Sequence, residues 1–224
     1  MENIYIIFKL ILYFSFLVLR YKMIIGVLGL KGSGKDTIGN YLIENYKFKK
    51  LAYADSLKDA ICCIFGWDRE MMEGITKESR VWREEVDPYW GVSPRHMMQK
   101  IGTDLFRKHI SDDIWIKSLK LKLKKMDCDI VITDCRFDNE IDLIKELGGK
   151  VILVERNFPM WKVITSSYRN GIISKSRAES ELIKTGIHET EWRCYLYDNI
   201  DYFIDNSGEI EELYLNIEKI ISKV

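Results

Sequence analysis

Short apolar runs alternate along the chain with longer amphipathic stretches, and this order predicts strands separated by helices. Runs of strand length occupy residues 23–28, 48–53, 129–134, 151–154 and 201–204. Stretches with helical spacing occupy residues 35–46, 55–65, 93–107, 112–125, 140–147 and 209–223. Strands that alternate with helices are typical of a sheet covered on both faces. The pattern therefore predicts a three-layer α/β/α fold with a five-stranded, mostly parallel sheet.

A glycine-rich loop separates the first strand from the first helix. Its glycines are Gly29, Gly32 and Gly34, and Lys35 follows at the start of the helix. Glycines let backbone N–H groups approach a phosphate, and a helix N-terminus favours an anion. A strand, a loop and a helix in this order are the context of a phosphate-binding P-loop, which favours it over a glycine-rich turn without a ligand. We therefore predict a P-loop NTPase fold and an enzyme that binds a nucleoside triphosphate. Its expected contacts are Gly29, Lys31, Gly32, Ser33, Gly34, Lys35, Asp36 and Thr37.

Asp36 departs from the usual P-loop pattern, in which a Ser or Thr after the lysine binds magnesium through its hydroxyl. Here a carboxylate takes that position and Thr37 follows it. Two arrangements are open for Asp36, direct binding of the metal or binding through water. Thr37 then caps the helix or contacts phosphate. Lys35 supplies a mobile charge for the β- and γ-phosphates. The predicted cofactors are ATP and Mg²⁺.

Composition limits the partners of the protein. Lys and Arg number 34, as do Asp and Glu, so the formal net charge is zero. A nucleic-acid groove needs a basic face, so we predict a small-molecule substrate and no nucleic acid. The five cysteines show no paired metal-ligand spacing and are expected to be reduced, intracellular thiols. We therefore predict a cytoplasmic enzyme.

Residues 4–19 form a mostly apolar stretch that Lys9 interrupts. A bilayer span needs about 20 residues, and no small-residue cleavage site follows. We predict that the working protein begins at Met23, which stands just before the first strand, and that residues 1–22 are an extension from an over-long reading frame. A membrane tether with the domain on the cytoplasmic side is the alternative. N-terminal sequencing of the native protein decides between them.

Two stretches between regular elements are expected to cover the site of a single domain at residues 23–224. Residues 66–91 are charged, aromatic and irregular, and we interpret them as an insertion over the acceptor pocket. Its aromatic residues are expected to pack rather than to stack on a base. Residues 157–193 form a basic, helix-forming excursion between two strands, as a closing lid does.

Several polar residues are expected to line the acceptor side. Lys58 lies in the first turn of a helix, where the helix dipole favours acids, and this indicates an anion partner; a solvated lysine is the alternative. Arg95, Gln99 and Gly102 fall on nearly one side of the helix at residues 93–107. A guanidinium suits a phosphate and an amide suits a base edge. A mid-helix glycine costs about 1 kcal/mol against alanine, so Gly102 indicates close backbone approach to a ligand.

Asp134 ends the apolar strand at residues 129–134, as the acid of a Walker B element does. The carboxyl ends of the strands are where such folds bind ligands. We therefore predict that Asp134 lies beside the P-loop, where it orients substrate or magnesium; a helix N-cap is the alternative. Arg136, Phe137 and Glu140 follow it closely.

These motifs, in this order, resemble the deoxynucleoside monophosphate kinases of phages and large DNA viruses. The resemblance rests on GLKGSGKDT, DSLKDAI, RHMMQKIGTDLFR, ISDDIW and TDCRFDNE, and it extends from Met23 to the C-terminus. It is weakest at residues 66–91. Asp36 is itself a feature of that family. The resemblance implies transfer of the γ-phosphoryl group of ATP to a dNMP, and a homodimer.

The resemblance also implies which residues act. Lys35, Asp36, Asp134 and Arg136 would be catalytic, and Asp36, Thr37 and Asp134 would hold Mg²⁺. The acceptor nucleotide would be bound by Lys31, Leu57, Lys58, Arg80, Arg95, Gln99, Gly102, Thr103, Arg107, Trp115, Asp134, Arg136, Phe137, Glu140 and Thr190.

Two other functions fit parts of the sequence. Animal-type phosphomevalonate kinases also carry Gly-Lys-Asp, but the Asp-x-Arg strand end and the Gly-Thr-Asp helix favour a nucleotide. A membrane-tethered regulator that uses ATP as a switch would need residues 4–19 as an anchor and an idle acceptor side. Turnover across dNMPs and phosphomevalonate, with fractionation, separates the three.

Overall fold

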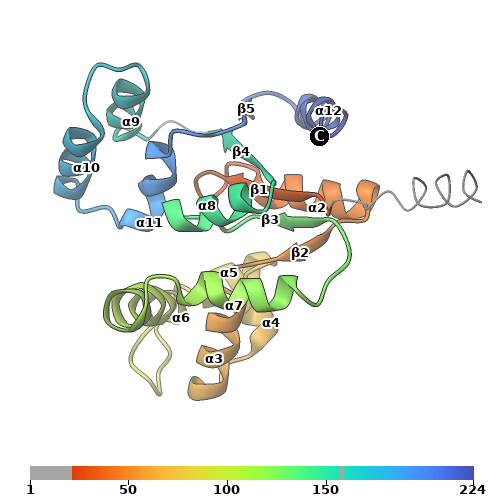
Figure 1. The fold of residues 1–224 in the computed structure, drawn as a ribbon. Helices are drawn as coiled ribbons and strands as arrows, with labels where there is room; N and C mark the ends of the chain where they lie inside the picture. The colour runs from red at the N-terminus through yellow and green to blue at the C-terminus, as the bar shows by residue number, and fades with distance from the viewer. Residues whose placement is uncertain (1–21, 157–158) are drawn as a thin grey trace, which may run out of the picture.

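The computed structural model describes residues 22–156 and 159–224 (Figure 1). The predicted extension or tether at residues 4–19 lies outside the described residues. The strands are β1 (Ile24–Leu28), β2 (Lys49–Leu51), β3 (Ile130–Ile132), β4 (Lys150–Glu155) and β5 (Tyr202–Asp205). They form one five-stranded sheet in the order β2-β3-β1-β4-β5, and each neighbouring pair is parallel. The predicted parallel α/β fold is confirmed, and β1 lies at the centre of the sheet.

Helices cover both faces of this sheet. The helical elements are α2 (Lys35–Tyr46), α3 (Asp55–Phe65), α4 (Arg69–Glu73), α5 (Lys77–Trp82), α6 (Pro94–Gln99), η1 (Lys100–Ile110), α7 (Ile114–Leu123), α8 (Asp138–Glu146), α9 (Lys162–Arg169), α10 (Lys175–Lys184), α11 (Glu189–Trp192), η2 (Arg193–Leu196) and α12 (Ile210–Ile221). Apolar residues of α2 and α12 pack on one face of the sheet, and those of α3, α7 and α8 pack on the other. Strands buried on both faces explain the continuous apolar runs in the sequence.

The helix expected at residues 93–107 changes its winding partway. Ser93 caps the start of α6, since its side chain accepts the N–H of His96. From Lys100 onward the chain continues as the π-helix η1 rather than as an α-helix. A π-helix has a wider turn, so the i, i+4, i+7 stripe predicted for Arg95, Gln99 and Gly102 does not continue regularly through Gly102. The expectation of one regular α-helix was wrong.

The start of α3 has no side-chain cap. Ala54 stands at the N-cap without a side-chain hydrogen bond. Asp55 instead accepts the backbone N–H of Ala52 at 3.0 Å. The turn before α3 is thus held by a local side-chain contact of its own.

The two covering regions lie apart, with α4 and α5 toward the β2 end of the sheet and α9 and α10 beyond its β4 end (Figure 1). The insertion folds into α4 and α5, and its aromatic residues pack together: Trp67 stacks on Phe65 with 4.4 Å between ring centroids and meets Trp82 edge-on. The lid helices have a small core of their own, built from Ala178, Leu182 and Trp192 with Leu196. The lid therefore has a core of its own, whereas the insertion packs into the main core through Trp67 and Met72.

Gly29→Ala is expected to destabilise the P-loop far more than Gly32→Ala. Gly29 has a φ of 144°, and an added Cβ would overlap the backbone oxygen of Val154. At Gly32, where φ is 81°, no heavy atom lies within 4 Å of that Cβ. We expect a loss of about 3 kcal/mol in the free energy of unfolding for Gly29→Ala, and about 1 kcal/mol for Gly32→Ala. Urea unfolding of both variants measures the difference, and equal losses would contradict the proposed crowding against β4.

Candidate active site

The P-loop follows the central strand β1 and leads into α2. Gly29, Gly32 and Gly34 all adopt positive φ, which glycine alone among ordinary residues tolerates well. The hydroxyl of Ser33 is buried and has no hydrogen-bond partner among the described residues. The Nζ of Lys35 donates to the carbonyl of Leu30 at 2.6 Å, so the lysine folds back over its own loop. A loop of this geometry presents N–H groups, a hydroxyl and an ammonium to an anion.

Burial and the nearby charge of Arg136 lower the pKa of Lys35 to about 8. A bound polyphosphate would restore the proton, because it stabilises the charged ammonium. Binding of ADP should therefore be independent of pH below about 8 and weaken by up to tenfold for each further pH unit. Calorimetric titration between pH 7 and pH 9.5 measures this dependence. Lys35→Arg should abolish it, since a guanidinium stays protonated throughout; an unchanged slope in that variant would contradict the assignment.

Asp36 lies at the start of α2 and faces β2 and β3. Its Oδ1 accepts the Nζ of Lys50 at 2.9 Å and the hydroxyl of Thr133 at 3.3 Å. Burial opposes its ionisation, but the hydrogen bond and charge of Lys50, the charge of Lys35 and the hydrogen bond from Thr133 together hold the pKa of Asp36 below its usual value. The carboxylate is therefore charged at neutral pH. Both contacts engage Oδ1. Oδ2 has no hydrogen-bond partner among the described residues, so it is open to a metal ion or to a metal-bound water.

Asp134 has a different environment from the one predicted. Its Oδ1 accepts the backbone N–H of Tyr53 at 3.0 Å, and its Oδ2 accepts that of Ala54 at 2.9 Å. Burial raises its pKa, although these two bonds oppose the rise. Each oxygen thus fastens the loop between β2 and α3 to the end of β3. We correct the prediction of a metal ligand: Asp134 is an anchor of the loop that carries the acceptor helix α3.

A cluster of cations faces the P-loop. Arg136, just after β3, affects the pKa of Lys35 and that of Arg95 on α6, so the three charges lie near one another. The carboxylate Oε1 of Glu191, on α11, lies 3.4 Å from Nη2 of Arg95 and 3.4 Å from Nη1 of Arg136. The cations predicted at Arg95 and Arg136 therefore meet beside the P-loop, where two anions could be held side by side.

Arg83 belongs to this cluster, and the sequence indicated Arg80 instead. Arg80 is exposed and donates to the carbonyl of Gly74 at 2.9 Å. Burial, followed by the charge of Arg95, lowers the pKa of Arg83. Its hydrogen bonds are long and reach neutral atoms, the carbonyl of Glu73 at 3.3 Å and the sulfur of Met98 at 3.7 Å, and its Nε has no partner among the described residues. A half-buried guanidinium with weak partners is suited to an incoming anion. Only its burial distinguishes it from Arg80.

Lys58 and Lys31 are both engaged by acids of the insertion. Lys58 is buried and its Nζ lies 2.7 Å from Oε2 of Glu73, which also pairs with Arg69. Lys58 therefore differs from both interpretations of the sequence. It is not solvated, and its ammonium group is already paired with a carboxylate rather than exposed to an anion. Lys31 of the P-loop meets Glu84 at 3.2 Å. This exposed pair connects the P-loop with the end of the insertion.

Gly102 allows two helices to approach, rather than a ligand. An added Cβ would lie 2.5 Å from Cδ2 of Leu57 on α3. The indole of Trp115 donates to the carbonyl of Gly102 at 3.0 Å, and both Leu57 and Trp115 belong to the core. Thr103 beside them is buried and Gln99 is half-buried. We therefore correct the inference from Gly102, and place Leu57 and Trp115 in the packing beneath the acceptor side.

Arg107 and Glu140 form a buried ion pair that contacts the backbone of Arg136. Arg107 donates to Glu140, and its guanidinium lies 4.0 Å from the ring centroid of Phe137. The other carboxylate oxygen of Glu140 accepts the backbone N–H of Arg136 at 2.7 Å and that of Phe137 at 3.2 Å. Burial raises the pKa of Glu140 to about 7, while Arg107 opposes the rise. Arg107, Phe137 and Glu140 were predicted to bind substrate. In the structure they contact one another, and Glu140 orients the backbone of Arg136.

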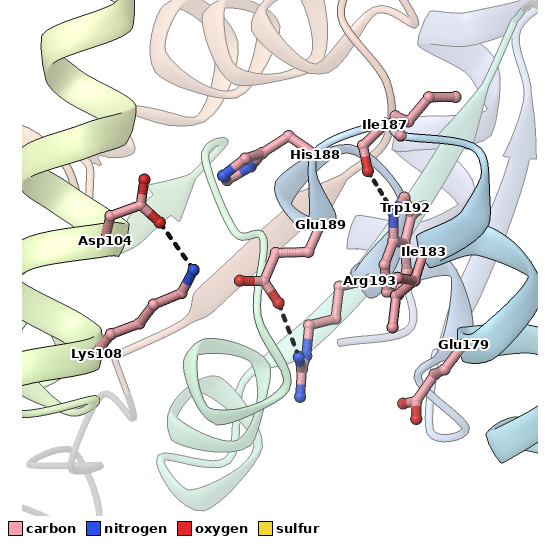
Figure 2. Close-up of a pocket in the computed structure, with 10 residues that line it drawn as sticks. Asp104, Lys108, Glu179, Ile183, Ile187, His188, Glu189, Trp192 and Arg193 are labelled. Atoms are coloured by element: carbon pink, nitrogen blue, oxygen red, sulfur yellow. Dashed lines mark hydrogen bonds and ion pairs between the residues drawn. The ribbon is translucent and has the colours of Figure 1, made fainter.

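Thr190 lies at the point where the lid meets Arg136. Its carbonyl accepts Nη1 of Arg136 at 3.1 Å, and its hydroxyl lies 2.9 Å from Nδ1 of His188. A cavity of about 370 Å³ lies between η1 and this part of the lid. Figure 2 shows the pairs Asp104–Lys108 and Glu189–Arg193 on its walls. None of its lining residues belongs to the P-loop. The cavity therefore lies beside the candidate site rather than at it.

The central P-loop, the strand order and the facing cations define a P-loop phosphotransferase. The sequence model of the family described as deoxynucleotide monophosphate kinase matches residues 68–162. A protein of Acanthamoeba polyphaga mimivirus, assigned as a deoxynucleotide monophosphate kinase, is 36% identical over 149 residues, which cover 60% of this chain and 74% of that protein. This chain belongs to the deoxynucleotide monophosphate kinase family, as the resemblance in the sequence predicted.

A more distant relative matches over more of the chain. The deoxynucleotide monophosphate kinase of Escherichia phage RB69 is 24% identical over an alignment that covers 86% of this chain and 97% of that protein. Among solved structures, shikimate kinase from Aquifex aeolicus superposes with a TM-score of 0.48 at 16% identity, covering 90% of this chain and 97% of that one. Within residues 22–156 and 159–224, no helix is long and apolar enough to cross a bilayer.

Proposed function

We propose that this chain transfers the γ-phosphoryl group of ATP to the 5′-phosphate of a deoxynucleoside monophosphate, giving ADP and the deoxynucleoside diphosphate. Membership in the family supports this reaction, because the relatives are kinases and the chain is therefore a phosphotransferase. Neither the family nor its relatives favour the phosphomevalonate or regulator alternatives. The observation that carries the proposal is the cation cluster, in which Lys35 of the P-loop faces Arg95 and Arg136.

The acceptor needs little activation in this reaction. A phosphate oxygen of the dNMP is already ionised and attacks the γ-phosphorus, while the bond to the β–γ bridging oxygen breaks and ADP leaves. Catalysis is then positioning and neutralisation of charge. Lys35 and the loop N–H groups hold the donor, and Arg83, Arg95 and Arg136 hold the acceptor phosphate. The lid excludes water, which would otherwise accept the phosphoryl group.

Magnesium fits one carboxylate of the site better than the other. Mg²⁺ usually binds one or two carboxylates together with substrate phosphates, and it neutralises charge on the β- and γ-oxygens. Asp36 is charged and has Oδ2 open, whereas both oxygens of Asp134 are already bound by backbone N–H groups. We propose that Asp36, with Thr37 next to it, would hold the ion with the triphosphate, and that Asp134 would not.

Steady-state release of ADP tests the proposed function. The purified chain is supplied with ATP and, in turn, with dTMP, dGMP, dCMP, dAMP, phosphomevalonate or no acceptor. We expect turnover that depends on at least one dNMP and stays at the level of the blank with phosphomevalonate. Turnover that is equal with and without every dNMP would refute the proposal, and the pattern among the four dNMPs reports the preferred base.

A further inference from the structure

Glu191 is the carboxylate that joins the lid to the acceptor cations. It lies on the short helix α11, and its side chain is 22% exposed. One of its oxygens, Oε1, lies 3.4 Å from Arg95 and 3.4 Å from Arg136. A single oxygen between two guanidiniums has the position that one oxygen of a phosphate would take.

The cations around Glu191 outnumber the acids that pair with them. Arg83, Arg95 and Arg136 lie near one another, and among the described residues Glu191 is the only carboxylate that pairs with any of the three. Glu84 acts on Arg83 and Arg95 through its charge, but it pairs with Lys31 at 3.2 Å. Glu73 also acts on Arg83, but it pairs with Lys58 at 2.7 Å. The three guanidiniums therefore retain a net charge of roughly two after Glu191 is counted, which matches the dianion of a phosphomonoester.

We propose that Glu191 is an internal counter-ion, which occupies the place of the acceptor phosphate when the site is empty and sets the acceptor specificity of the enzyme. The proposal rests on the proposed function. A phosphate dianion outcompetes the carboxylate because it carries more charge and more acceptor oxygens. A deoxynucleoside without a phosphate cannot displace Glu191, so the guanidiniums stay paired with it and do not bind uncharged acceptors. Glu191 thus weakens the binding of every anion and favours those with two charges.

A charge-removing substitution tests this, and the same lid segment offers its control. Glu191→Gln keeps the shape of the side chain and removes the competing charge. Glu189→Gln makes the same change two residues away, where Glu189 pairs with Arg193 at 3.1 Å on the wall of the cavity (Figure 2). We expect Glu191→Gln to lower the KM for the dNMP by about tenfold and Glu189→Gln to change it by less than about twofold.

Inorganic phosphate provides a second readout that needs no turnover. With ADP present at saturation to fill the P-loop, calorimetric titration should show phosphate binding about tenfold more tightly to Glu191→Gln than to the unaltered chain or to Glu189→Gln. If Glu191→Gln leaves both the KM and the phosphate affinity within twofold, or weakens either, Glu191 is not a competitor of the acceptor. If the unaltered chain shows no dNMP-dependent turnover, the proposed function fails, and the phosphate titration still decides on Glu191.

Discussion

Arg136→Ala should lower kcat/KM for the deoxynucleoside monophosphate by about 10²–10³, because one charge-assisted contact to the transferring group is worth about 2–4 kcal/mol. Arg136 stands between the two halves of the site: its charge reaches Lys35 and Arg95, and its Nη1 donates to the lid at Thr190. Removing the guanidinium leaves the P-loop intact. The affinity for ADP should therefore change by less than about threefold, so the loss appears on the acceptor side.

The lid offers a matched control for the loss of an arginine. Arg177 lies on α10, its side chain is 68% exposed, and it pairs with Glu181 one turn away. Arg177→Ala should change kcat/KM by less than about twofold, since exposed ion pairs contribute little. Arg136→Lys keeps the charge but not the planar fork, and should fall between the alanine variant and the unaltered chain. Rates for Arg136→Ala within threefold of the unaltered chain would remove Arg136 from the acceptor site.

Sequence reasoning succeeded where the deciding residues are neighbours in the chain. The strand, the glycines and the helix that make the P-loop fall within residues 23–46, so local spacing determines their geometry. The central strands β1, β3 and β4 were found because they are buried on both faces and form apolar runs. The edge strands β2 and β5 are only partly buried and were found from shorter apolar runs. The order of the strands in the sheet can be inferred from the family, but not from any single apolar run in the sequence.

Sequence reasoning failed where the contacts of a site residue come from residues far away in the sequence. Asp134 resembles a metal-binding acid at the end of a strand, but its partners are the N–H groups of Tyr53 and Ala54, some 80 positions earlier. Arg80 and Arg83 are both arginines of one short helical region, and only tertiary burial shows that Arg83 faces the cluster. Local propensity carries no information on such contacts.

The π-helix η1 illustrates the same limit. Its residues have ordinary helical character, and nothing in their periodicity distinguishes a π-turn from an α-turn. Tertiary contacts on three sides accompany the wider winding: Gly102 meets Leu57, Trp115 donates to the carbonyl of Gly102, and Arg107 reaches Glu140. π-Turns are frequent at functional sites, and this one lies between the acceptor side and the lid cavity.

Glu140→Ala is expected to lower the free energy of unfolding by about 3–5 kcal/mol, because it breaks a buried ion pair and leaves Arg107 with only the exposed Asp112, at 3.0 Å, as its counter-charge. The side chains of Arg107 and Glu140 are each 4% exposed. The substitution also removes the acceptor of two backbone N–H groups, at Arg136 and Phe137. Urea unfolding followed by circular dichroism measures the loss. Glu146→Ala on the same helix is the control: Glu146 pairs with Lys120 at the surface, and its loss should cost less than about 1 kcal/mol.

A double substitution separates the stability of this pair from its effect on the site. Arg107→Met with Glu140→Leu replaces both charges by apolar groups of similar size, and such replacements of buried ion pairs are often neutral or stabilising. Most of the stability lost in Glu140→Ala should therefore return. Activity should not return, because the backbone of Arg136 still lacks the carboxylate that orients it at 2.7 Å. A double variant that is both stable and fully active would show that Glu140 stabilises the fold without positioning Arg136, while one as unstable as Glu140→Ala would show that the backbone contacts, rather than the ion pair, account for the loss.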